Sequence, residues 1–234
     1  MVNAGRVSTP DAVPFDYDTN PDRYLIGSRL TKAYSQANLY VWVATLLERA
    51  DLVLDVGCAE GVLREAMPGR RVIGLDMAMA FLRNHPAPRV RASAAALPFR
   101  SNSVDAVTAL NMLYHLADPA QALREARRVL KPGGVLIAST VARTDSPEIS
   151  AYRVRLPSPF DAEEAPDIVR AVFGDVEVHT WDAPLVTLPT KESIREYLRA
   201  RMAGEEGAER GARELTTPLT VTKRGALVVA RLPA

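Results

Sequence analysis

Short continuous runs of apolar residues recur along the middle of the chain. A run of this kind, bounded by turn residues, is typical of a central strand in a parallel sheet, because both faces of such a strand are covered. Stretches with helical character separate the runs, and strands that alternate with helices predict a parallel, doubly wound α/β sheet. The predicted strands are 52–56, 71–75, 90–92, 106–110 and 135–139.

The helices between these strands have recognisable ends. One is predicted from about 61 to 67, and the next covers 77–84 and stops before Pro86. A third begins at Asp118-Pro119, because aspartate caps a helix and proline suits its first position.

The segment before the first strand predicts a helical lid over 20–49. Asn20-Pro21 suits a helix start, and apolar residues recur at helical spacing within 30–48. The tyrosines of this segment either pack the lid onto the sheet or, in the case of Tyr24 or Tyr34, face a ligand.

After residue 140 the pattern is less regular. Thr190 suits the cap of a helix with an apolar stripe, whereas a charged, glycine-rich segment that follows predicts an exposed connection. The other predictions here are a loop over 142–161, a helix over 162–173, a strand over 176–179, the connection over 204–213 and a hairpin or bent strand over 219–232.

The length of 234 residues suits one α/β core with a small lid. We therefore expect a single domain over 1–234, with a tail and lid up to residue 49 and a helical insertion near 190–213. Apolar and charged fractions of 47% and 24% are ordinary for a globular protein.

Charge and composition exclude several classes of function. The net charge is +1 without a long basic run, so we expect no nucleic-acid partner. The N-terminal residues lack the apolar stretch of a secretory signal, and no apolar run reaches the length of a membrane span. The single cysteine, Cys58, suits a reducing compartment. We expect a soluble, cytoplasmic protein without a membrane partner, and the sequence leaves its oligomeric state undetermined.

The stretch 52–61, LVLDVGCAEG, carries the first chemical signal. A buried strand is followed by Gly57 and Gly61, which allow a tight turn and a close approach of the backbone to a ligand. The helix that follows directs its free N–H groups toward the same place. Strand, turn and helix together predict a cofactor cradle, although many nucleotide-binding sheets share this pattern.

Further motifs follow the cradle in a fixed order. Asp55 lies two residues before Gly57, and Asp76 closes the next strand. With the motifs below, the chain resembles the class I S-adenosylmethionine-dependent methyltransferases, in the broad group of quinone- and natural-product-biosynthesis enzymes. The likeness is dense over 52–140. The additional motifs are ALPF at 96–99, SNSVDAV at 101–107, LNMLYHLADP at 110–119 and RRVLKPGG at 127–134.

This resemblance implies a fold and a reaction. The fold is a Rossmann-like, doubly wound three-layer sandwich with a seven-stranded, mostly parallel sheet, an antiparallel last strand and an N-terminal helical lid. The cofactor is S-adenosyl-L-methionine, which becomes S-adenosyl-L-homocysteine. The expected reaction is methyl transfer to a small-molecule acceptor in bacterial secondary or cofactor metabolism, with oxygen favoured over nitrogen or carbon.

The resemblance also implies which residues bind the cofactor. Asp55 orients its ammonium group, and the two oxygens of Asp76 accept from the ribose hydroxyls. The remaining expected contacts are Gly57 and Gly61 along the methionyl and ribose parts, the backbone of Ala94 at the adenine ring, Met77 and Leu97 on its faces, and Asn111 and Met112 at the methionyl end.

Two positions of the cradle depart from the family pattern. Ala59 stands where the family has a second glycine, so we expect a slightly opened turn. Ser93 stands where the family has an aspartate that accepts from the adenine amino group. A neutral hydroxyl makes a weaker hydrogen bond than a carboxylate, so we expect ordinary to weak cofactor affinity.

His115 is the candidate general base, because it follows the strand at 106–110 and an imidazole titrates near neutral pH. A packing role is the alternative. Tyr114 beside it is a candidate for the acceptor pocket. His85 and His179 lie outside the motifs and are predicted at the surface, and the sequence shows no metal-ligand cluster.

Two other functions remain open. One is an enzyme that methylates tRNA or protein, against which the absence of a basic stripe argues in the RNA case. The other is a methyltransferase-like module that binds a cofactor without methyl transfer, which Ala59 and Ser93 leave open. A nicotinamide dehydrogenase is the weakest alternative, because Asp55 and the LPF and LKPGG motifs would then have no role.

Overall fold

A computed structural model describes residues 17–234. Most of the predicted N-terminal tail, with the segment examined for a secretory signal, lies outside the described residues. Among the described helices, none combines the length and the apolar character needed to cross a lipid bilayer.

A seven-stranded sheet in the order β3-β2-β1-β4-β5-β7-β6 organises the chain. The strands from β3 to β5 run parallel, and β7 lies antiparallel to both β5 and β6. This arrangement confirms the predicted Rossmann-like, mostly parallel sheet. The strands are β1 (Leu52–Val56), β2 (Arg71–Asp76), β3 (Arg89–Arg91), β4 (Val104–Leu110), β5 (Leu130–Val141), β6 (Val176–Leu188) and β7 (Leu219–Arg231).

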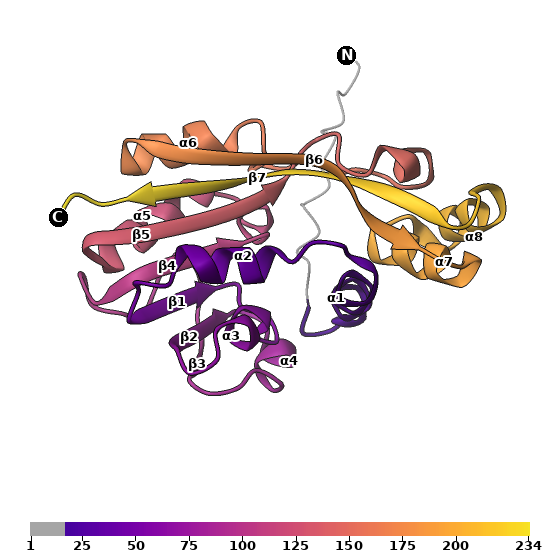
Figure 1. Cartoon of the computed structure of the whole chain (residues 1–234). Helices are drawn as coiled ribbons and strands as arrows, with labels where there is room; N and C mark the ends of the chain where they lie inside the picture. The colour runs from indigo at the N-terminus through magenta and orange to yellow at the C-terminus, as the bar shows by residue number, and fades with distance from the viewer. Residues whose placement is uncertain (1–16) are drawn as a thin grey trace, which may run out of the picture.

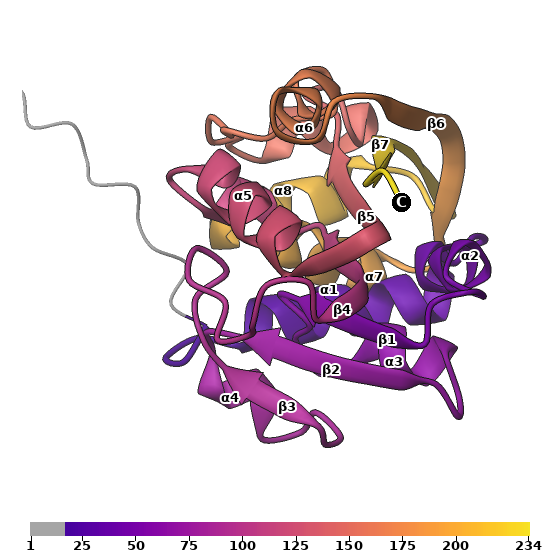
Figure 2. The same cartoon turned by 90° about the vertical axis from the view of Figure 1, so that its left-hand side faces the viewer.

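Helices cover both faces of the sheet, because successive residues of a buried strand point to opposite sides. Val53 packs on one side with Val43 of α2 and Leu63 of α3. Leu54 packs on the other side with Leu123 of α5 and residues of α6. Figure 2 shows α5 and α6 opposite α2 and α3. The helices are α1 (Asp22–Tyr34), α2 (Leu39–Leu46), α3 (Val62–Ala66), α4 (Met79–Leu82), α5 (Pro119–Val129), α6 (Ala165–Phe173), α7 (Lys191–Ala200) and α8 (Gly204–Glu214), with 3₁₀ turns η1 (Leu113–His115) and η2 (Pro147–Tyr152).

Two predicted helix caps are confirmed. The side chain of Asp118 accepts a hydrogen bond from the N–H of Gln121 at 3.2 Å, and Pro119 is the first residue of α5. Thr190 caps α7 and accepts from the N–H of Ser193 at 3.1 Å. These capping side chains give hydrogen-bond partners to helix N–H groups that would otherwise lack them.

The predicted continuous lid over 20–49 is two separate helices with different roles. Residues 35–38 separate the two helices. Asn38 starts α2, because its side chain accepts hydrogen bonds from the N–H groups of Tyr40 and Val41. Helix α2 packs on the sheet, and only α1 lies beyond the sheet edge (Figure 1). Residue Pro21, not Asn20, occupies the N-cap position of α1.

Strands β6 and β7 form a two-stranded arm that extends past the main sheet and carries α7 and α8 between them (Figure 1). The strand predicted over 176–179 is therefore longer. Of the two predictions for 219–232, a hairpin or a bent strand, the structure has a single strand. A second apolar core lies beneath the arm and includes Leu30 of α1, Val186 of β6 and Leu198 of α7. The arm is thus stabilised by its own packing.

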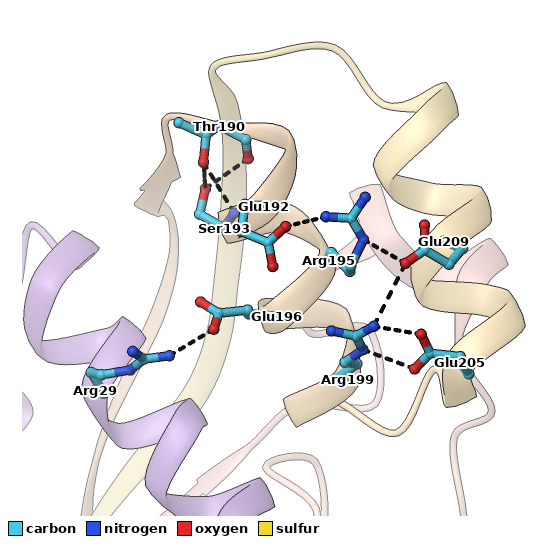
Figure 3. A network of polar contacts seen from close by, with 9 residues as sticks. All are labelled: Arg29, Thr190, Glu192, Ser193, Arg195, Glu196, Arg199, Glu205 and Glu209. Carbon is cyan, nitrogen blue, oxygen red and sulfur yellow. Dashed lines mark hydrogen bonds and ion pairs between the residues drawn. The ribbon is translucent and has the colours of Figure 1, made fainter.

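The prediction of an exposed connection over 204–213 is wrong. This segment is helix α8, and Gly207, Ala208, Gly211 and Ala212 form its buried face. Small residues at this spacing allow two helices to approach closely. On the outer side, Arg195 pairs with Glu209 at 2.6 Å, and Arg199 pairs with Glu205 (Figure 3).

Gly207 gives a test of this packing. A Cβ at Gly207 would lie 2.3 Å from the carbonyl oxygen of Tyr152, which is backbone and cannot rotate away. We expect Gly207→Ala to lower the free energy of unfolding by about 2 kcal/mol through overpacking, although alanine is the better helix former. Urea unfolding measures the change. Glu206→Ala, at an exposed position of the same helix, is the control and should stay within about 0.5 kcal/mol. Equal stability of the two variants would contradict the close contact.

Candidate functional site

A cavity of about 1780 Å³ opens at the carboxyl ends of the parallel strands. Ligands of open α/β sheets bind at this edge, where neighbouring strands connect in opposite directions. The turn after β1, the end of β2 and the segment after β4 form one part of its wall, and α1, α7 and the arm form the other. A pocket for one small ligand is usually about 300–1,000 Å³. The cavity therefore has room for two ligands side by side.

Gly57 shapes the floor of the cavity. Its φ of 70° lies in the left-handed region, and a Cβ there would come within 2.7 Å of the Met112 side chain. Only glycine meets both requirements without strain. Ala59 also has a left-handed φ, of 45°, so the alanine that replaces the family's glycine adopts the same backbone region at a steric cost. Gly57, Ala59 and Met112 all line the cavity.

Asp76 is held in place by the backbone of two loops. One carboxylate oxygen accepts from the N–H of Ala59 and the other from the N–H of Ala78, both at 2.9 Å. Burial raises the pKa of Asp76, and these N–H groups oppose that shift. Asp76 lines the cavity, and a carboxylate has more acceptor sites than these hydrogen bonds use, so it is fixed in place and still able to accept from a ligand.

Asp55 lies beneath the floor and does not line the cavity. Its carboxylate accepts from the hydroxyl of Thr108 on β4 at 2.7 Å. Burial raises the pKa of Asp55 to about 7, the Thr108 hydrogen bond lowers it, and the nearby Asp76 raises it. The ionised form of Asp55 is therefore weakly stabilised, and a cation above the carboxylate would favour it.

The residues predicted around the adenine ring divide into two groups. Met77, Ser93 and Ala94 line the cavity, and the Ser93 hydroxyl oxygen accepts from the N–H of Ala95 at 3.2 Å. Leu97 instead packs in the main core, where its N–H donates to Glu125 at 2.8 Å. The structure thus places Leu97 outside the wall. Gly61 also lies outside it, at the start of α3.

Asn111 follows β4 and has a left-handed φ of 53°. Its N–H donates to the carbonyl oxygen of Ser139 at 3.0 Å. Its side-chain oxygen is buried and accepts no hydrogen bond from the described residues. A buried acceptor without a partner is costly, and one in a cavity wall is suited to a ligand donor.

Aromatic rings line the part of the cavity beside α1. Tyr17 lies 5.1 Å from Phe81 and 5.7 Å from His115 between ring centroids, and Tyr24 lies 4.7 Å from Phe81. Tyr24, Tyr114 and His115 line the cavity, whereas Tyr34 packs against the apolar core beneath the arm. Tyr17 and Phe81 could not be predicted as site residues from the sequence, since no motif includes them.

The imidazole of His115 is neutral at physiological pH. Burial lowers its pKa to about 4, and the positive charge of Arg23 adds to the shift. Its Nε2 lies 3.4 Å from the hydroxyl of Tyr17, which also accepts from Arg23 at 2.8 Å. A neutral imidazole at this position is able to accept a proton.

The prediction that His85 lies at the surface is wrong. His85 is only 1% exposed and fits against Gly61 and Gly74, where a Cβ would come within 3 Å of its ring. His179 is partly exposed and lies 5.3 Å from Trp42 between ring centroids. Within residues 17–234, no three acidic, histidine or cysteine side chains gather in a way that could hold a metal ion.

Comparison with known proteins agrees with this geometry. Residues 54–138 match the family model described as a methyltransferase domain. Residues 54–138 therefore carry a methyltransferase domain. It is 39% identical over 116 residues to the ubiquinone biosynthesis O-methyltransferase of Pseudomonas paraeruginosa, a match that covers 41% of this chain and 48% of that one. The chain thus spans about half the length of the curated relatives it matches.

Solved structures extend the fold likeness over most of the chain. An S-adenosylmethionine-dependent methyltransferase of Thermotoga maritima, described as a possible histamine N-methyltransferase, superposes with a TM-score of 0.59 at 18% identity. That match covers 92% of this chain and 96% of the other. The cyclase SpnF matches with a TM-score of 0.58 at 18% identity, over 91% and 97% of the two chains. The fold is therefore shared, while the reaction differs among its members.

S-adenosylmethionine is the cofactor that the methyltransferase domain implies, and the cavity fits it. The fixed Asp76 carboxylate suits a pair of ribose hydroxyls. The unpartnered oxygen of Asn111 suits a hydrogen-bond donor at the methionyl end of the cofactor.

The raised pKa of Asp55 predicts an unusual stability profile. A folded-state pKa of about 7, above the ordinary 3.8, contributes stability at low pH that is lost as pH rises through 7. The isosteric Asp55→Asn variant avoids this loss. We expect it to be more stable than the wild type at pH 8, by at most about 4 kcal/mol, and similar at pH 4. Urea unfolding at both pH values measures the difference.

Asp105 provides the opposite case on the same sheet. Burial would raise its pKa, but the hydrogen bonds from Lys131, at 2.7 Å, and from the N–H of Leu52 bring it below the usual value. Asp105→Asn should therefore be less stable than the wild type at pH 8. An Asp55→Asn variant that also loses stability at pH 8 would show that Asp55 is ionised and well paired.

Proposed function

We propose that the protein transfers a methyl group from S-adenosylmethionine to a small organic acceptor, with a hydroxyl oxygen favoured over nitrogen or carbon. The observation that carries the proposal is the single cavity that joins the cofactor cradle to an aromatic-lined half beside His115. The curated relatives named as ubiquinone biosynthesis O-methyltransferases support the acceptor class and a place in bacterial small-molecule biosynthesis.

Each part of the cradle has a proposed role. Asp76 accepts from the ribose hydroxyls, and the backbone of Ala94 and the hydroxyl of Ser93 contact the adenine ring, with Met77 on its face. Asn111 and Met112 contact the methionyl end. Asp55 acts from below, where a ligand ammonium above the floor would stabilise its ionised form.

The bound cofactor supplies an activated methyl group on a sulfonium with a good leaving group. The chain must hold the acceptor in line behind that carbon, exclude water and receive a proton. The cofactor would give its methyl group to the acceptor oxygen and keep the bonding electron pair on its sulfur, and His115 would receive the proton that the acceptor hydroxyl loses. Tyr17, Tyr24 and Tyr114 enclose the acceptor beside that imidazole.

A different function is favoured by one comparison. The cyclase SpnF shares the fold, so a cofactor-binding protein of this architecture need not transfer a methyl group. Incorporation of a radioactive methyl group from the labelled cofactor into a small-molecule extract separates the two functions. Cofactor binding without any labelled small product, protein or RNA would favour the module that does not transfer methyl.

Cofactor binding tests the role of Asp76. We expect micromolar affinity for S-adenosylmethionine and its demethylated product by calorimetric titration, and a loss of about 100-fold or more in Asp76→Ala. The loss follows from two charge-assisted hydrogen bonds to ribose. Asp167→Ala, at an exposed position of α6 away from the cavity, is the control. A folded wild-type protein that binds neither ligand would contradict the proposed function.

The protonation of His115 is a second test. Because burial lowers its pKa to about 4, the imidazole is neutral above pH 5, and the rate should stay flat from pH 6 to pH 8 and fall toward pH 4. NMR titration of the histidine rings measures the pKa directly, with His115→Asn assigning the signal. The same variant should lower kcat by about 100-fold if His115 is the base. His179→Asn, outside the cavity, should not. Titration of His115 near 6.5 would contradict the buried environment.

A further inference from the structure

The cavity wall opposite the cofactor cradle is positively charged. Arg153 follows η2, Arg201 follows α7, and Lys223 lies on β7, and all three line the cavity. These residues are far apart in the sequence, and the folded arm brings them to one place. No sequence motif marks them.

The nearby carboxylates already have partners. Asp145 pairs with Lys223 and also accepts from the N–H of Arg224 at 2.9 Å. Asp161 pairs with Arg155 at 2.8 Å and with Arg143 at 3.0 Å. The charges of Lys223 and Asp145 therefore cancel, and so do those of Arg155 and Asp161.

Arg153 and Arg201 are different, because neither forms an ion pair with a carboxylate of the described residues 17–234. One nitrogen of Arg153 donates to the carbonyl oxygen of Asp145 at 2.7 Å. The guanidinium of Arg201 lies over the ring of Tyr197, 4.6 Å from its centroid. Both side chains are only partly exposed, so water compensates their charges incompletely.

The ionisation of Tyr197 reports the resulting field. Burial alone would raise the pKa of this fully buried phenol, but Arg201 and Lys223 bring the pKa below its usual value. A buried tyrosine ordinarily has a raised pKa. The wall therefore holds an excess of positive charge that an anion would neutralise.

Arg201 also lies near the aromatic half of the cavity. It lies against α1, where a Cβ at Gly27 would be 3.1 Å from its Nη1. The positive charge of Arg201 also acts on the hydroxyl of Tyr114, the neighbour of His115. An anion bound at Arg201 thus lies in the same cavity as the aromatic half of the site.

We propose that the acceptor is an aromatic acid, whose carboxylate binds Arg153 and Arg201 while its ring lies among the tyrosines beside His115. The planar guanidinium matches a carboxylate with two parallel hydrogen bonds. The inference rests on the proposed methyl transfer and names the class of its acceptor. The hydroxyl to be methylated is then held at the far end of the ring from the carboxylate.

The test uses matched pairs of hydroxybenzoic and dihydroxybenzoic acids and their neutral amides, titrated into the full chain saturated with S-adenosylhomocysteine. We expect at least one acid to bind about 10-fold or more tightly than its amide. Arg201→Gln should weaken the binding of that acid by about 30-fold or more, because the substitution removes one side of a desolvated charge pair. The affinity for the amide should stay unchanged. Arg153→Gln should act in the same direction, and Arg201→Lys, which keeps the charge without the fork, should lose less.

Arg199→Gln is the matched control. Arg199 lies two residues before Arg201 but pairs with Glu205 on the outer side of α7 (Figure 3). The Arg199→Gln variant should bind the acids with the affinity of the wild type. Affinity for S-adenosylhomocysteine, measured in every variant, shows that the fold and the cradle are intact, and its absence in the wild type would refute the methyl-transfer proposal instead. Amides that bind as tightly as acids, acids that do not bind at all, or an Arg201→Gln variant with unchanged acid affinity would each overturn the inference.

Discussion

Two hydrogen bonds to the carboxylate of Asp76 hold the site together. They come from the backbone N–H groups of Ala59 and Ala78, which belong to loops after neighbouring parallel strands. The carboxylate thus sets the spacing of these two loops. Asp76 also lines the cavity as a hydrogen-bond acceptor, so the same carboxylate positions the two loops and is available to bind a ligand. The raised pKa of Asp76 shows the cost of its burial.

The part of the fold that depends on local rules could be predicted from the sequence. The apolar run of 52–56 is buried on both faces and forms β1, and Asp118 and Thr190 cap the helices that follow them. Gly57 is needed where the chain turns with a positive φ. The cofactor half of the site follows from the same segments, because motif and geometry lie within a few residues of one another.

Features that depend on distant contacts could not be predicted. Glycines indicate turns in a local pattern, yet Gly207 and Gly211 lie inside α8, because Tyr152 and Leu198 pack directly against them. His85 is buried by the close approach of Gly61 and Gly74. Leu97, inside a recognisable motif, packs in the core instead of the wall, since the motif fixes the path of the chain and not the direction of each side chain.

The apolar core beneath the arm is separate from the cores on the two faces of the sheet, and this division affects how the protein can evolve. The cofactor half of the cavity rests on the main sheet, whereas Arg153 and Arg201 follow η2 and α7, which both pack in the apolar core beneath the arm. Substitutions in the arm therefore alter the side chains that face the acceptor without disturbing the sheet beneath the cofactor. This architecture lets selection exchange substrates while the cofactor machinery is inherited intact, as mutations of one half carry few pleiotropic costs in the other.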